Sequence, residues 1–436
     1  MKRSERAGVL VPGILLPRGG VDPRRWAVVA CDQYTSQPDY WNGIEREVGG
    51  APSALRLILP ECFLGTPEEP ARVREAGRTM EEYVRGGILA PVGPGFVLVT
   101  RTAGGKTRHG LVLALDLEQY DFRPGSTSLI RASERTIVER IPPRLAIRRD
   151  ALLELPHILV LIDDPERTVI EPLLSKEDRF PALYDTELMG NGGSLKGSLV
   201  DREDDVDAVL HALEALADPD AFDRKYPGKA PFLFAMGDGN HSFATAKTHW
   251  ENLKQTLSPA EREDHPARWA LVEVENLHDE GIVFEPIHRA VFGMDEGSAE
   301  TLRGILAAQN GLCAVLSGDV PEDGAGGHLL PFLLGGGKRW YHVPEPAARI
   351  PVGTLQNALA ELVRIRPDLR IDYIHGEDAL LELAKQEGTC AFPLPAMEKS
   401  ELWPTMVYEG VLPVKAFSMG EANEKRYYME ARIIKR

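Results

Sequence analysis

Cysteine is scarce in this sequence, with four in 436 residues. They stand at Cys31, Cys62, Cys313 and Cys390, with no CxxC pair among them. This wide spacing excludes a dense disulfide framework and fits a reducing compartment. We therefore expect a cytoplasmic protein.

Long apolar runs are also missing. No segment approaches the roughly 18 uninterrupted apolar residues that a membrane helix needs. The best early candidate, residues 8–17, is short and is interrupted by Pro12 and Pro17. It is typical of an entry strand or loop rather than of a signal-peptide core, so we expect no membrane partner.

Positive charge is in deficit, since Lys plus Arg number 50 and Asp plus Glu number 66, a formal net charge of −16. A surface of this sign argues against general attraction to nucleic acid or anionic lipid. The expected partner is a small-molecule substrate, bound in a local patch. The oligomeric state stays open.

What the sequence does contain is an alternation of strand-like runs and amphipathic segments, which predicts an α+β fold of mixed sheets with flanking helices. Strands are expected at residues 25–30, 95–101, 111–115 and 158–162, and helices at 206–216, 299–308 and 354–365. Loop-like composition at 317–327 and 345–353 marks two seams. We expect an N-terminal α/β region (1–120), a central nucleotide- or phosphate-binding domain (121–296) and a C-terminal α+β region (297–436).

The most informative stretch is PFLFAMGDGNHSFATAKTHW, residues 231–250. An apolar run ends in a turn, Gly237 to His241, and helical spacing of apolar residues follows from Phe243. A strand, turn and helix in this order direct backbone N–H groups and the positive end of the helix dipole at one point, which favours phosphate or carboxylate. The alternative is a simple turn in which Asn240 or Ser242 caps the helix.

A basic island, RASERTIVERIPPRLAIRR at residues 131–149, carries six arginines and two glutamates. The planar fork of arginine suits phosphate and carboxylate oxygens, so the island is a candidate for neutralising an anionic ligand. Alternatively, its arginines pair with surrounding acids. Within it, Arg131 and Glu134 are the residues of most interest. The sequence leaves open whether the island and the Gly237–His241 turn share one site.

Two further segments allow more than one interpretation. The loop around Gly190 to Gly193, with Lys196 nearby, lacks the phosphate-loop pattern and predicts a β-hairpin, although Lys196 remains a candidate to face a ligand. In residues 268–292, a cluster of polar side chains can supply general acid–base groups or metal ligands, or can hold the ends of a hairpin. That cluster comprises His278, Asp279, His288 and Arg289.

Near the start of the chain, Cys31 follows an expected strand and is interpreted as structural, because no basic partner is identifiable. Near its end, residues 423–426 are expected in a solvated turn. Lys415 and Ser418 are expected in or beside the final strand.

Several of these stretches, in this order, resemble the bacterial family catalogued as domain of unknown function 1015. They are ILLPRGGVDPRRWAVVACDQYTSQPDYW, RASERTIVERIPPR, LPHILVLIDDP, GDGNHSFATAK, FEPIHR, IDYIHG and LPVKAFSMGEANEKRYYMEARII. The resemblance covers nearly the whole chain. It implies little about activity, because that family is largely uncharacterised.

More remotely, GDGNHSFATA resembles the signature of the ParB/sulfiredoxin-like superfamily, in which a Gly-x-His-Arg turn at a helix start contacts nucleotide phosphates. The resemblance implies a ParB/sulfiredoxin-like central unit, nucleotide binding, and ATP- or ADP-dependent phosphorylation of a small acceptor, as in free-serine kinases. Glu275-Asn276 lies at the interval of a second ParB motif. Two departures are Ser242 in place of the arginine and an acidic balance that opposes ParB-like DNA binding.

We therefore expect a nucleotide-dependent phosphotransferase acting on a small hydroxyl-bearing metabolite, with ATP or ADP and Mg²⁺ as cofactors. Asp238 is expected to bind Mg²⁺, His241 to contact a transferring oxygen, and Glu134 to act as base for the acceptor hydroxyl. Expected nucleotide-binding residues are Gly237, Gly239, Asn240, Ser242, Arg131, Lys196, His288 and Arg289. Alternatives are a non-catalytic nucleotide- or metabolite-binding module and a metal-dependent hydrolase using His278, Asp279 and His288.

Overall fold

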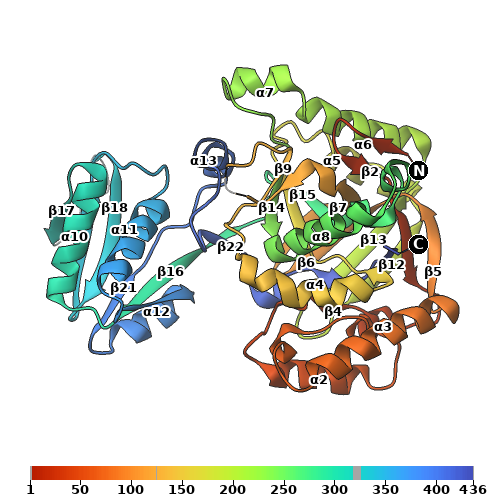
Figure 1. Cartoon of the computed structure of the whole chain (residues 1–436), viewed down its shortest axis with the longest axis horizontal. Helices are drawn as coiled ribbons and strands as arrows, with labels where there is room; N and C mark the ends of the chain where they lie inside the picture. The colour runs from red at the N-terminus through yellow and green to blue at the C-terminus, as the bar shows by residue number, and fades with distance from the viewer. Residues whose placement is uncertain (1, 124, 318–325, 436) are drawn as a thin grey trace. The chain divides into compact units, whose positions relative to one another are not determined.

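The computed structural model describes residues 2–123, 125–317 and 326–435. The chain forms two compact units, one of Met1–Ile282 with Gly420–Arg436 and one of Val283–Met419 (Figure 1). Most of the expected seam at 317–327 lies outside the described residues.

The first unit is built on an 11-stranded sheet among the described residues, with strand order β12-β13-β6-β7-β15-β11-β14-β9-β8 and with β1 and β2 branching from β7. Residues before and after position 120 share this sheet. Its strands are β1 (Arg3–Ser4), β2 (Val9–Leu10), β6 (Phe96–Ala103), β7 (Lys106–Asp116), β8 (Tyr120–Asp121), β9 (Ile130–Arg131), β11 (Leu159–Ile162), β12 (Ala182–Glu187), β13 (Ser194–Val200), β14 (Phe234–Asp238) and β15 (Trp269–Asn276).

Smaller strand pairs and helices complete this unit. The remaining strands are β3 (Gly13–Pro17), β4 (Val28–Val29), β5 (Leu89–Pro94), β10 (Leu153–Glu154), β23 (Tyr427–Tyr428) and β24 (Arg432–Ile433). The helices are α1 (Pro23–Trp26), α2 (Pro38–Val48), α3 (Glu69–Arg85), α4 (Ile141–Asp150), α5 (Glu171–Leu174), α6 (Glu203–Leu216), α7 (Pro219–Lys225), α8 (Asn240–Leu253) and α9 (Pro259–Glu263).

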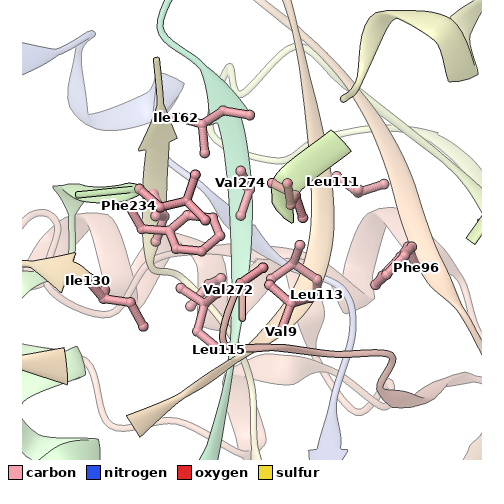
Figure 2. Close-up of a cluster of buried hydrophobic side chains, with 14 of the residues drawn as sticks. Val9, Phe96, Leu111, Leu113, Leu115, Ile130, Ile162, Phe234, Val272 and Val274 are labelled. Carbon is pink, nitrogen blue, oxygen red and sulfur yellow. The ribbon is translucent and has the colours of Figure 1, made fainter. Parts of the chain in front are cut away.

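Alternation along the central strands gives the large sheet two buried faces. Leu111, Leu113 and Leu115 of β7 share one face with Val272 and Val274 of β15 (Figure 2). Apolar side chains of α6 and α8 cover this face. The alternate side chains, which point to the other face of the sheet, belong to a second core. That core also contains residues of α2, α3, β23 and the segment after β23. The sheet is therefore covered on both sides, and all eight residues of the central strand β15 are buried.

The second unit has a seven-stranded sheet among the described residues, with order β17-β19-β18-β21-β16-β20 and with β22 paired to β16. Its strands are β16 (Phe284–Phe292), β17 (Ala314–Ser317), β18 (His328–Leu334), β19 (Gly337–Val343), β20 (Arg370–His375), β21 (Thr389–Phe392) and β22 (Phe417–Met419). Its helices are α10 (Glu296–Asn310), α11 (Pro351–Ile365), α12 (Glu377–Ala384) and α13 (Leu402–Glu409).

These elements confirm the α+β class and most of the expected segments. The strands at 95–101, 111–115 and 158–162 correspond to β6, β7 and β11, and the three amphipathic segments lie in α6, α10 and α11. Residues 25–30 are different, because only Val28–Val29 is a strand and Pro23 starts a helical turn instead. The expected hairpin within 268–292 is wrong, since β15 and β16 belong to different sheets.

The last residues of the chain are integral to the first unit. β23 pairs with β4, and β24 pairs with β10. The expected solvated turn is wrong, because Lys425 and Arg426 are only 8% and 4% exposed. Arg426 lies against Glu273 of β15 at 2.7 Å and against Glu430 at 2.8 Å. Ion pairs compensate the burial of these charges, which composition alone does not reveal.

Arg432→Met tests the contribution of such a pair to stability. The Arg432 guanidinium donates to Glu154 at 2.6 Å, and both side chains are 6% exposed. Removing it leaves Glu154 with Arg148 as its remaining charged partner, so we expect the free energy of unfolding to fall by about 1–3 kcal/mol in urea titrations. In the same unit Arg78→Met, which loses an exposed pair with Glu75, should leave the midpoint unchanged. Equal urea midpoints in the two variants would show that the buried Arg432–Glu154 pair contributes no more to stability than the exposed Arg78–Glu75 pair.

Candidate functional site

The site is built around the turn between β14 and α8. β14 ends at Asp238, and Gly239 adopts φ +82° before α8 starts at Asn240. A Cβ at Gly239 would lie 3.2 Å from the Cα of Ile158, so both the backbone conformation and the close neighbour require glycine. Because the N-cap is a glycine, no side chain caps this 14-residue helix. Its first turn therefore carries the positive end of the helix dipole without a capping group.

Neither residue expected to cap the helix does so. The Asn240 amide is paired with Ser133 in both directions, accepting from its backbone N–H and donating to its hydroxyl, each at 3.2 Å. The Ser242 hydroxyl lies 2.8 Å from Nε2 of His157. The capping interpretation of the turn is thus wrong, and both side chains connect α8 to other segments.

The basic island meets the turn. Besides the Ser133 pair, the backbone N–H of Ile137 donates to Nε2 of His241 at 3.3 Å. Glu134 lies between these two anchors and is half-buried. The island then continues into α4, which packs beside α8 (Figure 1). The segment that contains Glu134 and the start of α8 are therefore adjacent, a point that the sequence leaves open.

Asp238 is held by a cation from the far end of the chain. Its Oδ2 lies 3.2 Å from Nζ of Lys425, and its Oδ1 accepts from the Gly239 N–H at 2.9 Å. Burial acts to raise the pKa of Asp238, but the Lys425 ammonium and these hydrogen bonds outweigh it and hold the pKa below its usual range. The carboxylate is therefore ionised at neutral pH.

A second polar chain starts at Ser242. Nδ1 of His157 lies 2.7 Å from the hydroxyl of Tyr428, which accepts from the backbone N–H of Cys31 at 3.1 Å. Oδ2 of Asp32 lies 3.9 Å from Nε2 of His157. Burial, with the nearby Asp32 carboxylate, raises the pKa of the Cys31 thiol, which agrees with the structural role expected for that residue.

Most arginines of the island have acidic or backbone partners, which favours the interpretation that they pair with surrounding acids. Arg144 forms an ion pair with Glu61, and Arg148 with Glu154. Arg131 donates to the carbonyl oxygens of Ser128, Ala230 and Pro231. Burial lowers its pKa to about 10. These bonds hold the strand β9 segment against the start of β14.

The remaining predicted residues belong to elements other than β14 and α8. Nζ of Lys196 is paired with Glu177 at 3.0 Å, and β13 is five strand positions from β14, about 24 Å at the usual spacing. His288 and Arg289 lie on β16 in the other unit. His288 accepts from the Leu394 N–H at 3.0 Å, and Arg289 donates to the carbonyl of Val414 at 2.6 Å.

The residues of the metal-dependent alternative do not converge. His278 lies 2.8 Å from Asp163, and Asp279 lies 3.1 Å from His109. His288 belongs to the second unit. Across the described ranges, no group of three or more His, Cys, Asp or Glu side chains is placed to hold a metal ion.

Three residues of the site escaped the sequence analysis, namely Lys425, His157 and Tyr428. His157 is adjacent to the apolar run that forms β11, and β11 pairs with β14 so that Leu159 is opposite Asp238. A polar residue just before the apolar run of β11 was therefore a usable signal for His157, because this end of β11 lies beside the end of β14. Lys425 and Tyr428 had none, because a distant segment brings them.

Comparisons with known proteins bear mainly on family. A family model described as "Protein of unknown function (DUF1015)" matches residues 15–362. No curated protein matches the chain by sequence. Among the helices that the structure describes, none has the length and apolarity to cross a membrane.

Solved structures similar to the chain include a mutant free serine kinase in complex with AMP, at 12% identity and TM-score 0.38, covering 74% of this chain and 91% of that one. A conserved hypothetical protein from Pyrococcus furiosus has 12% identity and TM-score 0.35, with coverages of 74% and 95%. SbnI with a C-terminal truncation, from Staphylococcus aureus, has 10% identity and TM-score 0.35, with coverages of 73% and 82%. Likeness of this size carries no argument about activity.

Gly239→Ala tests the geometry of the turn. We expect a loss of about 1–2 kcal/mol for the left-handed conformation and a further loss from contact with Ile158. Gly228→Ala is the matched control, with φ +72° and open space around its Cβ position. Urea unfolding should therefore rank Gly239→Ala as clearly the less stable variant. If the control is equally destabilised, the close approach to Ile158 contributes nothing.

Lys425→Met tests the electrostatics of Asp238. In the wild type the depressed pKa gives stability that is complete above the unfolded value of about 3.9 and is lost as pH falls through the folded pKa. Without the ammonium, burial dominates and the pKa of Asp238 should rise, which a carboxyl NMR titration measures. Lys2→Met, which breaks the Asp207 pair elsewhere, should leave this titration unchanged. An unshifted Asp238 in Lys425→Met would exclude Lys425 as the cause.

Proposed function

Because the chain belongs to the DUF1015 family, whose function is unknown, its activity has to be argued from its own residues, and we propose a nucleotide-dependent phosphotransferase that acts on a small hydroxyl-bearing metabolite. One observation carries the proposal. The Ser133–Asn240 and Ile137–His241 hydrogen bonds hold the segment that contains Glu134 against the uncapped start of α8.

Phosphate binding is assigned to the start of α8. Backbone N–H groups of a first helical turn and the helix dipole favour a phosphoryl group there. Gly239 gives the backbone its left-handed turn into the helix, and Asn240, anchored on Ser133, fixes the first turn. Lys425, at 3.2 Å from Asp238, adds a positive charge on an otherwise acidic protein. Once Asp238 binds Mg²⁺, the Lys425 ammonium would neutralise phosphate charge, the role for which the sequence suggested Arg131 and Lys196.

Mg²⁺ is assigned to Asp238, where it would displace the Lys425 ammonium that pairs with the carboxylate. In phosphotransferases Mg²⁺ is usually held by one or two carboxylates and by the phosphates themselves, so a cage of several protein ligands is not needed. Asp238 supplies one carboxylate, whose low pKa keeps it charged. The cation would neutralise charge on the nucleotide phosphates.

The transfer step needs a base and a contact to the moving phosphoryl group. The acceptor hydroxyl oxygen bonds to the phosphorus that is transferred as its proton moves to the Glu134 carboxylate. The bond from that phosphorus to its leaving group breaks at the same time. His241 accepts from the Ile137 N–H through Nε2, so its proton is on Nδ1. We assign His241 the contact to a phosphoryl oxygen in the transfer step.

A non-catalytic nucleotide- or metabolite-binding module is the second candidate. It is favoured by the engagement of both Asp238 oxygens, one with Lys425 and one with the Gly239 N–H. Because both oxygens already have partners, the Asp238 carboxylate can serve to hold the turn in a binding protein as well as in an enzyme. Binding without product formation distinguishes this candidate from a phosphotransferase.

Nucleotide binding is tested by thermal unfolding with ATP, ADP, CTP and GTP, with and without Mg²⁺. A ligand at about 100 times its Kd stabilises the folded state by about 2.7 kcal/mol, which raises Tm measurably. We expect ATP or ADP to raise Tm in the wild type but not in Asp238→Ala or His241→Ala. Asp163→Ala, which breaks an Asp–Lys pair at the opposite end of β11, is the matched control and should retain the shift. No shift with any nucleotide would refute the proposal.

Glu134→Gln separates catalysis from binding. Losing a general base should lower kcat about 10²–10⁴-fold while KM for the nucleotide stays unchanged, because the amide keeps the shape of the side chain. The measurement is nucleotide turnover during a screen of hydroxyl-bearing acceptors. If no acceptor supports turnover although the nucleotide binds, the binding module is the correct function.

A further inference from the structure

We propose that Ser242 is a covalent nucleophile of this site, activated by His157 as general base, so that phosphoryl transfer passes through a phosphoserine at position 242. The inference rests on the proposed phosphotransferase function and deepens it. It gives Ser242, which was expected only to bind nucleotide, a role in the reaction. It also gives roles to His157 and Tyr428, which the sequence analysis missed.

The geometry is that of an activated nucleophile. Oγ of Ser242 lies 2.8 Å from Nε2 of His157, within the reach required for proton transfer between a nucleophile and its base. The base is oriented by a third group, since Nδ1 of His157 lies 2.7 Å from the Tyr428 hydroxyl. The backbone N–H of Cys31 donates to that same hydroxyl at 3.1 Å, which fixes the tyrosine oxygen.

The proposal requires one proton arrangement. For His157 to act as the base, its proton is on Nδ1 and is donated to the Tyr428 oxygen, so that the Nε2 lone pair accepts from the Ser242 hydroxyl. Burial raises the pKa of Tyr428 well above its ordinary value, so the tyrosine remains neutral. Tyr428 is therefore a positioning residue that selects the tautomer, and it takes no part in the proton transfer.

The surroundings suit the charges that develop. Once His157 is protonated, the Asp32 carboxylate 3.9 Å from its Nε2 stabilises the imidazolium. The His157 side chain is only 10% exposed, which shields it from bulk water, whereas Ser242 is half-buried and remains reachable. Ser242 is in the first turn of α8, where the helix dipole favours the attacking oxygen and the phosphoryl group alike.

The chemistry balances in two steps. In the first, Oγ of Ser242 bonds to the terminal phosphorus of the nucleotide, the bond from that phosphorus to its bridging oxygen breaks, and the Oγ proton moves to Nε2 of His157. In the second, the acceptor oxygen bonds to the phosphorus and its proton moves to Glu134. Oγ then leaves with the electron pair and recovers its proton from His157.

The experiment exposes the full-length protein to ATP or ADP with Mg²⁺ and no acceptor, quenches it in acid, and measures intact mass and the modified peptide. We expect one phosphoryl group on Ser242 in the wild type and none in Ser242→Ala. His157→Asn should slow its appearance about 10²–10⁴-fold. Thr248→Ala is the matched control, because it removes a hydroxyl from the same helix that bonds only to the carbonyl of Ala244. This variant should label like the wild type.

Two additional readouts separate mechanism from structure. Tyr428→Phe should shift the pH dependence of labelling, because the His157 tautomer is no longer fixed, and a merely structural tyrosine would change stability alone. A fluorophosphonate probe tests the nucleophile without any nucleotide. It should label Ser242 in the wild type and fail to label Ser242→Ala.

The outcomes distinguish this inference from the proposed function. Nucleotide turnover that persists in Ser242→Ala, with no phosphoserine in the wild type, would overturn the covalent step and leave the phosphotransferase standing. No nucleotide binding would overturn both the phosphotransferase and the phosphoserine. Fluorophosphonate labelling of Ser242 would then support the activated serine alone, and its absence would exclude that as well.

Discussion

The ion pairs of the C-terminal segment are the interaction on which the rest of the first unit depends. Arg426 lies between Glu273 of β15 and Glu430, and the Glu430 carboxylate in turn accepts from the Tyr184 hydroxyl. These groups are buried, so removing one partner would leave an uncompensated charge in a region that excludes water. The pairing therefore fixes the path of the segment on the sheet, and this path brings Lys425 to Asp238 and Tyr428 to His157.

The same face of the sheet explains why so much charge is buried without disrupting the fold. Leu271, Glu273 and Glu275 are alternate residues of β15, so their side chains lie on the same face of the sheet. That face is apolar at Leu271 and polar at the two glutamates. Gly110 of β7 makes room for Glu273, since a Cβ there would meet the carboxylate at 2.3 Å. Burial, opposed chiefly by Arg108, raises the pKa of Glu275 to about 7. Glu273 and Glu275 each have an arginine partner, Arg426 and Arg108, but burial outweighs the Arg108 charge at Glu275.

The periodicity of apolar residues in the sequence predicted those elements whose formation depends on neighbouring residues. The α+β class, the strands β6, β7 and β11, the helices α6, α10 and α11 and the strand–turn–helix at residues 231–250 follow from periodicity and turn residues. The separation of β15 and β16 into different sheets did not, because nothing in residues 276–284 indicates that the chain enters a second sheet there. His157 and Tyr428 are 271 residues apart, and periodicity contains no information about such contacts. A charged run such as residues 423–426 is typical of a solvent-exposed turn. Lys425 and Arg426 are buried instead, because they form ion pairs with residues far away in the sequence.

The start of α8 has the residues for an ordinary helix cap and does not use them as one. Asn240 and Ser242 are both good capping residues, yet one pairs with Ser133 and the other with His157, while the N-cap position itself is glycine. A typical cap contributes about 1 kcal/mol, so forgoing it is a cost in stability that the long-range contacts offset. Those contacts fix Glu134 and His157 at the end of an uncapped dipole. A turn that served stability alone would need neither residue, whereas a turn that binds a phosphoryl group and activates a hydroxyl needs both.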